Sequence, residues 1–361
     1  MTADALPTDD RLVYTTEELL AGGSYEEPLI ANGVRCHGGF DADGNYRSPR
    51  TLHRNPAIRA WQARLEREGH EVLSIPAAAM PPQYPNAAQA KLLLRNGVRE
   101  PMARTLTVIS IVEGFGAMVR DVVVPDLDAL IVEPCEGTAL AHLSQGLFEA
   151  HARDESGYRD EGGHKQMWEA ARDAALENPK VPGDVLMRLM GRRGRGERPK
   201  PMFPEIGPTA ERMIAFMAQV LVVEVFAEGT FAWGIDVLSD PEVSAAPEVA
   251  GAMVANIRAD ESPHVEYLRT ALSELRARTL RTVDGHEIAG RTVVDGVIHR
   301  VLSNMSRTRQ SDQREDIRDG LLAAMQQVAN PGALLEEFDS LAESWTPPEK
   351  TGFEPVAAAS A

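Results

Sequence analysis

Two stretches of the chain, at 160–164 and 260–264, share the pattern Asp-Glu-x-x-His. On a helix, a Glu and a His three positions apart project from the same face, so each stretch can offer a carboxylate and an imidazole to one metal ion. The pattern alone is a weak signal, because roughly one such pair arises by chance in a chain this rich in glutamate. Its meaning depends on the other carboxylates that accompany it.

Three further glutamates lie in strongly apolar stretches. Glu113 lies within LTVISIVEGFGAMV, and Glu224 and Glu228 lie within VLVVEVFAEGTF. No Lys or Arg lies within a helical turn of these residues in the sequence. An ionised carboxylate buried in such surroundings must be protonated, paired or bound to a cation. We therefore predict that these glutamates belong to a metal site.

In chain order the pattern is Glu, Glu-x-x-His, Glu, Glu-x-x-His. This order resembles that of the ferritin-like diiron-carboxylate superfamily, of the non-haem diiron oxygenase or oxidase type, over residues from about 87 to 280. The resemblance implies six metal-binding and catalytic residues: Glu113, Glu161, His164, Glu228, Glu261 and His264. Glu224, one turn before Glu228 on the same face, is the alternative to Glu228, and the separation from Glu261 favours Glu228.

Each motif is preceded by an aspartate, as in oxygenase-type members of the superfamily. One position back rotates a side chain by about 100° on a helix, so Asp160 and Asp260 would miss the metal and reach the histidine of the facing helix. We expect Asp160 to accept a hydrogen bond from His264 and Asp260 one from His164, which would fix both imidazoles. His151 and Glu155 are expected to lie outside the site.

The cofactor implied is a pair of iron ions, with manganese or a mixed Mn/Fe pair as the alternative. Four carboxylates and two neutral imidazoles around two divalent ions sum to zero charge. Mixed oxygen and nitrogen ligands suit Fe or Mn better than a thiolate-seeking metal, although they do not exclude Zn.

These residues require helices that place them together. Apolar residues at three- and four-residue spacings predict an all-α fold with four core helices: about 86–119, 138–176 with a break near Gly157, 209–238, and 247–278 with a kink at Pro263. The expected organisation is an irregular N-terminal arm with a hairpin (1–85), a ferritin-like dimetal four-helix bundle (86–280), a C-terminal hairpin with helices (281–345) and a flexible tail (346–361).

Composition limits the partners. The 361 residues include 54 Asp plus Glu against 37 Lys plus Arg, a formal charge of −17, which argues against binding to nucleic acid or to an acidic membrane surface. The first residues are polar and acidic, unlike a signal peptide, and no run of about 18 uncharged apolar residues occurs. We expect a cytoplasmic protein. Its two cysteines, Cys36 and Cys135, are too few and too far apart for a disulfide framework.

The expected function is that of an oxygenase or oxidase that activates O₂ and oxidises a small organic substrate by hydroxylation, desaturation or N-oxidation. The resemblance implies electrons from a separate ferredoxin or reductase, and a homodimer is compatible with it. One class of N-oxygenases in the superfamily carries an extra histidine where Ile257 stands, which disfavours an arylamine N-oxygenase. The alternative is a non-catalytic, ferritin-like iron-binding protein.

Overall fold

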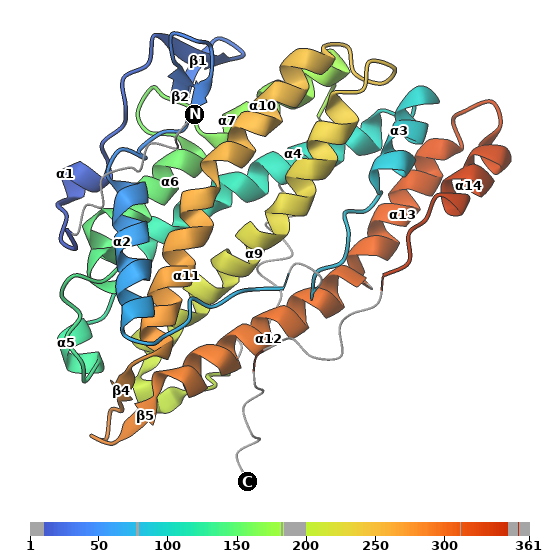
Figure 1. The fold of residues 1–361 in the computed structure, drawn as a ribbon. Helices are drawn as coiled ribbons and strands as arrows, with labels where there is room; N and C mark the ends of the chain where they lie inside the picture. Colours follow the sequence, from blue (N-terminus) through green and yellow to red (C-terminus); the bar gives the residue numbers. More distant parts are fainter. Residues whose placement is uncertain are drawn as a thin grey trace.

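The computed structural model describes residues 11–76, 79–181, 183, 200–310, 312–345 and 353, with side chains throughout these ranges except at 306–316. Within them the chain is mainly helical, with two small antiparallel sheets (Figure 1). The expectation of a mainly α-helical protein is confirmed at the level of fold class.

The central helices lie in the range where the sequence predicts them, but three of the four are interrupted. They are α3 (Ala87–Arg95), α4 (Glu100–Gly116) continued by the short η2 (Ala117–Asp121), α6 (Phe148–Ser156), α7 (His164–Leu176), α9 (Pro208–Leu238), α10 (Pro247–Asp260) and α11 (Ser262–Arg276). Only α9 is continuous, because it is apolar on nearly every side and contains no interior proline.

Each interruption has a local cause. Gly97 at φ +75° separates α3 from α4, and Gly157 at φ +82° ends α6, a backbone conformation that favours glycine. The predicted kink near Pro263 is present as a break at Glu261, where α10 ends and α11 begins. Proline lacks the N–H that would continue the hydrogen-bonding pattern and is tolerated in the first turn of the new helix.

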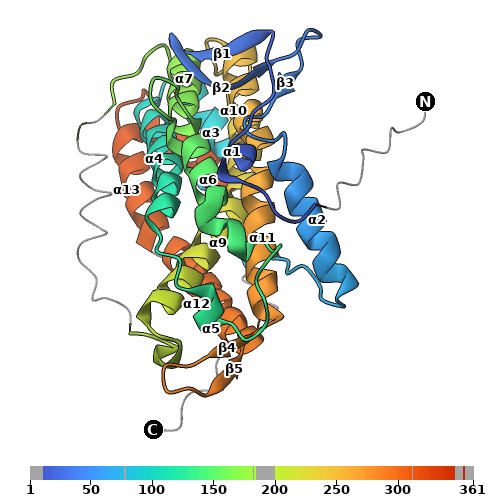
Figure 2. The same ribbon diagram turned by 90° about the vertical axis from the view of Figure 1, so that its left-hand side faces the viewer.

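Helices α4, α6, α7, α9, α10 and α11 pack side by side around a common axis (Figures 1 and 2). α4 packs against α6 and α7, α10 packs against α7 and α9, and α11 packs against α9. Their apolar side chains form two separate buried clusters, one around Tyr267 and Leu221 and the other around Trp168 and Phe231. Along α9, the buried residues of the first cluster end at Val222 and those of the second begin at Ala227. A layer of polar residues therefore divides the core, and Glu224 lies in it.

The N-terminal arm folds onto one end of this assembly. After α1 (Thr16–Leu19), strands β1 (Glu27–Ala31), β2 (Val34–Phe40) and β3 (Tyr46–Arg47) form an antiparallel sheet in that order. The hairpin expected in the arm is thus confirmed, and helix α2 (Arg54–Arg67) follows it. β2 also pairs with the loop between α6 and α7, because Gly162 N–H donates to the Arg35 carbonyl (2.8 Å) and His37 N–H donates to the Gly162 carbonyl (3.0 Å).

The short elements between the helices are α5 (Leu127–Leu130), η3 (Leu140–His142), η4 (Leu143–Leu147) and η5 (Pro204–Ile206). Strands β4 (Thr279–Arg281) and β5 (Glu287–Ala289) confirm the C-terminal hairpin. It is shorter than its sequence suggests, since helix α12 (Gly290–Gln310) begins directly after it, followed by α13 (Asp312–Met325) and α14 (Pro331–Ser340). The predicted tail at 346–361 lies outside the described residues except for Phe353, which is buried.

Two helical stretches, Glu100–Asp121 and Pro208–Leu238, are long and apolar enough to cross a membrane by length and composition alone. Both pack against other helices, and the core helix of a soluble protein passes the same test. One or two such helices are weak evidence, so the expectations of no membrane contact and a cytoplasmic location stay predictions.

Candidate metal centre

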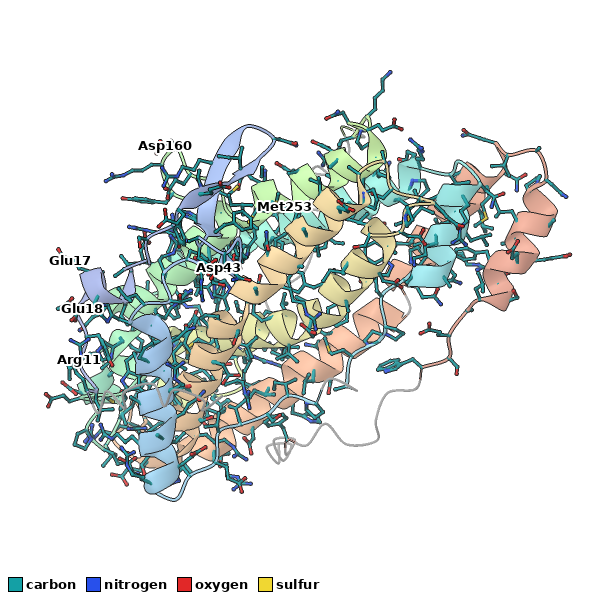
Figure 3. All side chains as sticks on the ribbon, turned by 45° about the horizontal axis from the view of Figure 1, so that its top comes forward. Arg11, Glu17, Glu18, Asp43, Asp160 and Met253 are labelled. Atoms are coloured by element: carbon teal, nitrogen blue, oxygen red, sulfur yellow. The ribbon has the colours of Figure 1, made fainter. Side chains whose placement is uncertain are left out.

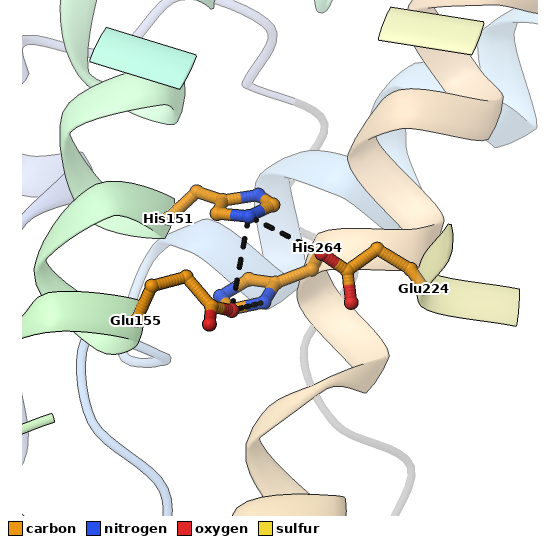
Figure 4. Close-up of side chains that lie close together, drawn as sticks. All are labelled: His151, Glu155, Glu224 and His264. Atoms are coloured by element: carbon orange, nitrogen blue, oxygen red, sulfur yellow. Dashed lines mark ion pairs between the residues drawn. The ribbon is translucent and has the colours of Figure 1, made fainter. Parts of the chain in front are cut away.

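Seven ionisable side chains from five helices meet in the polar layer of the core. None of the seven side chains is more than 10% exposed. They are Glu113 of α4, His151 and Glu155 of α6, His164 at the start of α7, Glu224 of α9, Glu261 at the break between α10 and α11, and His264 of α11. Figure 4 shows His151 and Glu155 facing Glu224 and His264 across the bundle.

The seven residues contain two overlapping groups of four with metal-ligand spacing. In each group the ligand atoms all lie within 4.8 Å of one another. One group consists of His151, Glu155, Glu224 and His264, and the other of Glu155, His164, Glu261 and His264. Glu155 and His264 belong to both. Glu261 lies between two of the histidines, because its Oε1 is 2.9 Å from Nδ1 of His164 and its Oε2 is 2.8 Å from Nδ1 of His264.

Several atoms of this cluster lack hydrogen-bond partners. His151 Nε2, Glu155 Oε1, His164 Nδ1 and Glu261 Oε1 are buried and make no hydrogen bond of acceptable geometry with any described residue. They nevertheless converge, with His164 Nδ1 3.3 Å and His151 Nε2 3.8 Å from Glu155 Oε1. Buried polar atoms in proteins are almost always satisfied. Unsatisfied nitrogen and oxygen atoms that point at a common centre are the donor set that a divalent cation requires.

The electrostatics also favour cations. Burial and the charges of Glu155 and Glu261 hold the pKa of Glu113 well above its ordinary value, and burial with the charges of Glu261 and Glu155 does the same for the pKa of Glu224. Burial lowers the pKa of His164, but Glu261 and Glu155 outweigh it and leave that pKa well above the ordinary value. Among the described residues no Lys or Arg pairs with these four glutamates. Two divalent cations would neutralise four carboxylates.

Two aspartates, Asp154 and Asp260, lie behind two of the imidazoles. Asp260 Oδ2 lies 3.4 Å from Nε2 of His164, the pair that the sequence predicts. Asp154 Oδ2 lies 3.0 Å from Nε2 of His264, a position expected for Asp160. In both pairs the aspartate and the histidine come from opposite sides of the bundle, so each Nε2 faces a carboxylate and each Nδ1 faces the cluster. The hydrogen bond with Asp154 fixes which ring nitrogen of His264 faces the cluster, whereas His164 Nε2 lies near Asp260 without a hydrogen bond of acceptable geometry.

The N-terminal arm supplies the layer behind the aspartates. Arg54 Nη1 donates to Asp154 Oδ2 (2.8 Å) and Arg50 Nε donates to Asp154 Oδ1 (2.8 Å). Burial alone would raise the pKa of Asp154, but the two guanidinium groups outweigh it and hold that pKa well below its ordinary value. On the other side, the Tyr46 hydroxyl donates to Asp260 Oδ2 (2.7 Å). The arm is therefore part of the centre.

Two predicted positions of the first motif are wrong. Because Gly157 ends α6, residues 157–163 form a loop and Glu161 does not share a helical face with His164. The Glu161 carboxylate lies instead 3.0 Å from Nδ1 of His37, with its side chain 36% exposed. Asp160 is exposed, and Figure 3 shows it at the outer edge of the molecule. The pairing of Asp160 with His264 is absent.

The preference for Glu228 over Glu224 is also wrong. The Glu228 side chain is 57% exposed and forms an ion pair with Arg258 of the neighbouring α10. One turn earlier, Glu224 is buried, and its Oε1 lies 3.3 Å from Nε2 of His151. No Lys or Arg lies within one turn of Glu228 on its own helix. The cation that pairs with it is Arg258, which comes from another helix.

Three residues of the centre were missed: His151, Glu155 and Asp154. The expectation that His151 lies outside is wrong, since it is fully buried, stacks on His264 at 4.0 Å between ring centroids, and has Nδ1 3.1 Å from the Tyr267 hydroxyl. One signal could have found them, because Asp154-Glu155 repeats the Asp260-Glu261 dipeptide and precedes the predicted helix break. The structure shows why α4 carries Gly116 at this level, since a Cβ there would come 2.6 Å from Cγ of Glu155.

A large cavity reaches the centre at Glu113. Its volume is about 1010 Å³, and it runs between α4, α9 and α13. The part nearest Glu113 is apolar, with Val108, Ile109 and Val112 from α4 and Val223 and Phe226 from α9. The cavity gives a small molecule access to one side of the centre.

The chain has no match among models of known protein families, among curated proteins or among solved structures. The arrangement of buried histidines and glutamates, which could hold metal ions, therefore carries the functional argument by itself.

Proposed function

We propose that the protein is a diiron oxidoreductase of the ferritin-like type, which uses O₂ to oxidise an organic substrate. The observation that carries the proposal is the pair of adjoining groups formed by the ligand atoms of three buried glutamates and three buried histidines. Glu113 lies beside them, with its Oε2 3.9 Å from Nδ1 of His164. The helices that supply these residues also support it, because α4, α6, α9 and α11 each bring at least one of them to a single centre.

The residues divide between two metal positions. Glu113 and His164 would hold one ion, and Glu224, His151 and His264 the other, with Glu155 and Glu261 between them. A bound pair of iron ions supplies the electron transfer needed to reduce O₂ and oxidise a substrate bond. Manganese or a mixed pair suits the same ligands.

The chain's own residues prepare this chemistry. Asp154 and Asp260 hold the imidazole rings, and the Tyr267 hydroxyl holds His151 so that its Nε2 faces Glu224. The apolar layers above and below the cluster exclude water from the centre, which strengthens its electrostatic interactions. The cavity at Glu113 admits the substrate.

The overall reaction balances as substrate R–H plus O₂, two electrons and two protons, giving R–OH and water. The two electrons must come from a separate redox protein, of the ferredoxin or reductase class, or from an equivalent chemical reductant. The same electron balance serves desaturation, in which the substrate loses two hydrogens and O₂ leaves as two waters with two external electrons.

The test begins with anaerobic addition of Fe²⁺ to metal-free protein. We expect saturation at about two iron ions per chain, consumption of O₂ on exposure to air, and a coupled diferric signal by Mössbauer spectroscopy. The matched pair Glu224→Gln and Glu228→Gln locates the site, since only the first should lose iron.

Two results would oppose the proposal. Less than half an equivalent of iron in folded protein would remove the metal centre altogether. Uptake far beyond two ions per chain, without O₂-dependent turnover of any substrate, would favour the alternative of a non-catalytic iron-binding protein.

A further inference from the structure

We propose that the cavity binds a long-chain carboxylic acid, with the alkyl chain extending toward Glu113 and the carboxylate at the opposite end, beside Arg99 and Arg104. This inference rests on the proposed function for its chemistry, but the binding of the chain is a property of the cavity alone. It implies that a carbon atom of the substrate is oxidised, which favours hydroxylation or desaturation over N-oxidation.

The length of the cavity favours an extended molecule. Its lining follows one stripe of α4, from Arg99 and Glu100 to Val112 and Glu113. Thirteen helical steps of 1.5 Å correspond to about 20 Å. The volume of about 1010 Å³ lies at the upper end of the range for small-molecule sites. A compact substrate would leave most of this length unfilled.

The inner end of the cavity selects an apolar group. Around Glu113 the described lining side chains are aliphatic or aromatic, and they include Val108, Val112, Val223 and Phe226. Burying a polar or charged substrate group there without a hydrogen-bonding partner would be unfavourable, because the group would lose its hydrogen bonds to water. Methylene and methyl groups, in contrast, are stabilised when they leave water for such a lining.

The outer end is polar and carries the only cations in the described lining. Arg99 and Arg104 lie there with the amides of Asn96 and Gln83. Arg104 pairs with Glu100 (2.9 Å) and Arg99 pairs with Glu177 (2.8 Å), both at partly exposed positions. Exposed ion pairs of this kind contribute little to stability, so a ligand carboxylate can take the place of either glutamate at small cost. The N-terminus of α4, which adds a partial positive charge, lies at the same end.

The experiment measures binding of cis-parinaric acid, a fluorescent polyunsaturated fatty acid, to metal-free protein and to protein loaded with two metal ions. Hexadecanoate, 1-hexadecanol and butyrate serve as competitors. We expect saturable binding in both forms and displacement by hexadecanoate. 1-Hexadecanol should compete about 10-fold less well, and butyrate should not compete. Absence of saturable binding, or equal competition by butyrate, would overturn the inference.

Variants test the location. Ile109→Trp fills the cavity from α4, and Ala324→Phe fills it from α13, so that one of the two remains informative if the other fails to fold. Each should weaken binding by at least about 10-fold, whereas Val249→Trp, at an exposed site on α10 outside the lining, should change it less than twofold. Arg104→Gln should weaken binding of the acid and leave binding of the alcohol unchanged. Unchanged binding in both filling variants would place the ligand elsewhere and overturn the inference.

Orientation is tested with Mn²⁺ as a paramagnetic probe in the metal centre. ¹³C-labelled hexadecanoate should show stronger relaxation at its methyl carbon than at its carboxyl carbon, and the reverse order would overturn the assignment. Metal content is measured on the same samples. Lost chain binding with both ions present refutes this inference alone, whereas chain binding by protein that takes up no metal supports the cavity assignment and refutes the proposed function.

Discussion

Asp154 and His264 lie on different helices and meet at 3.0 Å in the centre of the bundle. The corresponding pair, Asp260 and His164, meets at 3.4 Å across the same axis. Each aspartate directly precedes a glutamate of the metal centre. In each dipeptide, Asp154-Glu155 or Asp260-Glu261, the glutamate therefore lies among the candidate ligands while the aspartate faces a histidine from the opposite side of the bundle. The two halves of the site therefore hold each other in place.

Asp260→Asn should reduce metal affinity or activity by about 10- to 100-fold, because the amide no longer provides the charge that holds the His164 ring. Competition with a chelator measures the affinity. Asp160→Asn, at an exposed loop position, is the matched control and should behave like wild type. An effect of Asp260→Asn smaller than about twofold would show that the aspartate does not orient the histidine.

Glu155→Gln should lower metal affinity by at least about 10-fold, because Glu155 belongs to both groups of ligand atoms and its loss affects both metal positions. Glu161→Gln should leave the metal content unchanged, since Glu161 lies on the loop beside His37. Elemental analysis after reconstitution and desalting compares the two. If Glu161→Gln lost metal and Glu155→Gln kept it, the loop between α6 and α7 would have to be rearranged in the metal-bound protein.

His151→Ala should weaken the binding of one of the two metal ions selectively, by about 10-fold or more. His151 approaches Glu224 and His264, whereas His164 lies at the other metal position. A two-step chelator titration separates the two affinities. The exposed His286→Ala provides the control. Two unchanged affinities would mean that His151 only packs beneath the centre.

Glu224→Gln should have opposite effects on the metal-free and the metal-loaded protein. Without ions, one fewer buried carboxylate reduces repulsion in the cluster and should stabilise the fold by about 1 kcal/mol, or about 1 °C in Tm for a chain of this length. With ions, the loss of a ligand should lower Tm. Differential scanning calorimetry with and without chelator measures both, and Glu228→Gln is expected to shift neither. A shift of the same sign in both states would argue against a metal ligand.

Glu274 should make stability depend on pH. Burial raises the pKa of Glu274 to about 7, although its carboxylate accepts the backbone N–H groups of Leu140 and Ala139. A raised folded-state pKa gives a contribution that is complete below the unfolded value near 4.5 and is lost as the pH rises through about 7. The loss is on the order of 3 kcal/mol.

Urea denaturation between pH 5 and about 8 tests this dependence. The difference in unfolding free energy between wild type and Glu274→Gln should fall as the pH rises, whereas the exposed Glu287→Gln should show a constant difference. A wild-type minus Glu274→Gln difference that increases with pH would have the wrong sign.

The sequence predicts the helices better than the ligands, for physical reasons. Helix α9 is apolar around most of its circumference, so its ends agree with prediction within about one residue. The choice between Glu224 and Glu228 depends on Arg258 of another helix, which no local pattern reveals. Glu161 lies three residues before His164, but that spacing places two side chains on one face only within an unbroken helix. The helix break at Gly157 removes this condition. Glu261 and His264 were found because the second motif lies at the first turn of α11, which keeps their three-residue spacing meaningful. His164 reaches the centre from the start of α7 without Glu161.

The hydrogen bond between Tyr46 and Asp260 joins residues 214 positions apart. The bond ties the N-terminal arm to the segment that carries Glu261 and His264, so one side-chain contact links the arm to the metal centre across the chain. Closing so long a loop is slow relative to forming local helices. We therefore expect the arm to dock after the individual helices have formed, so that this end of the centre is completed late in folding.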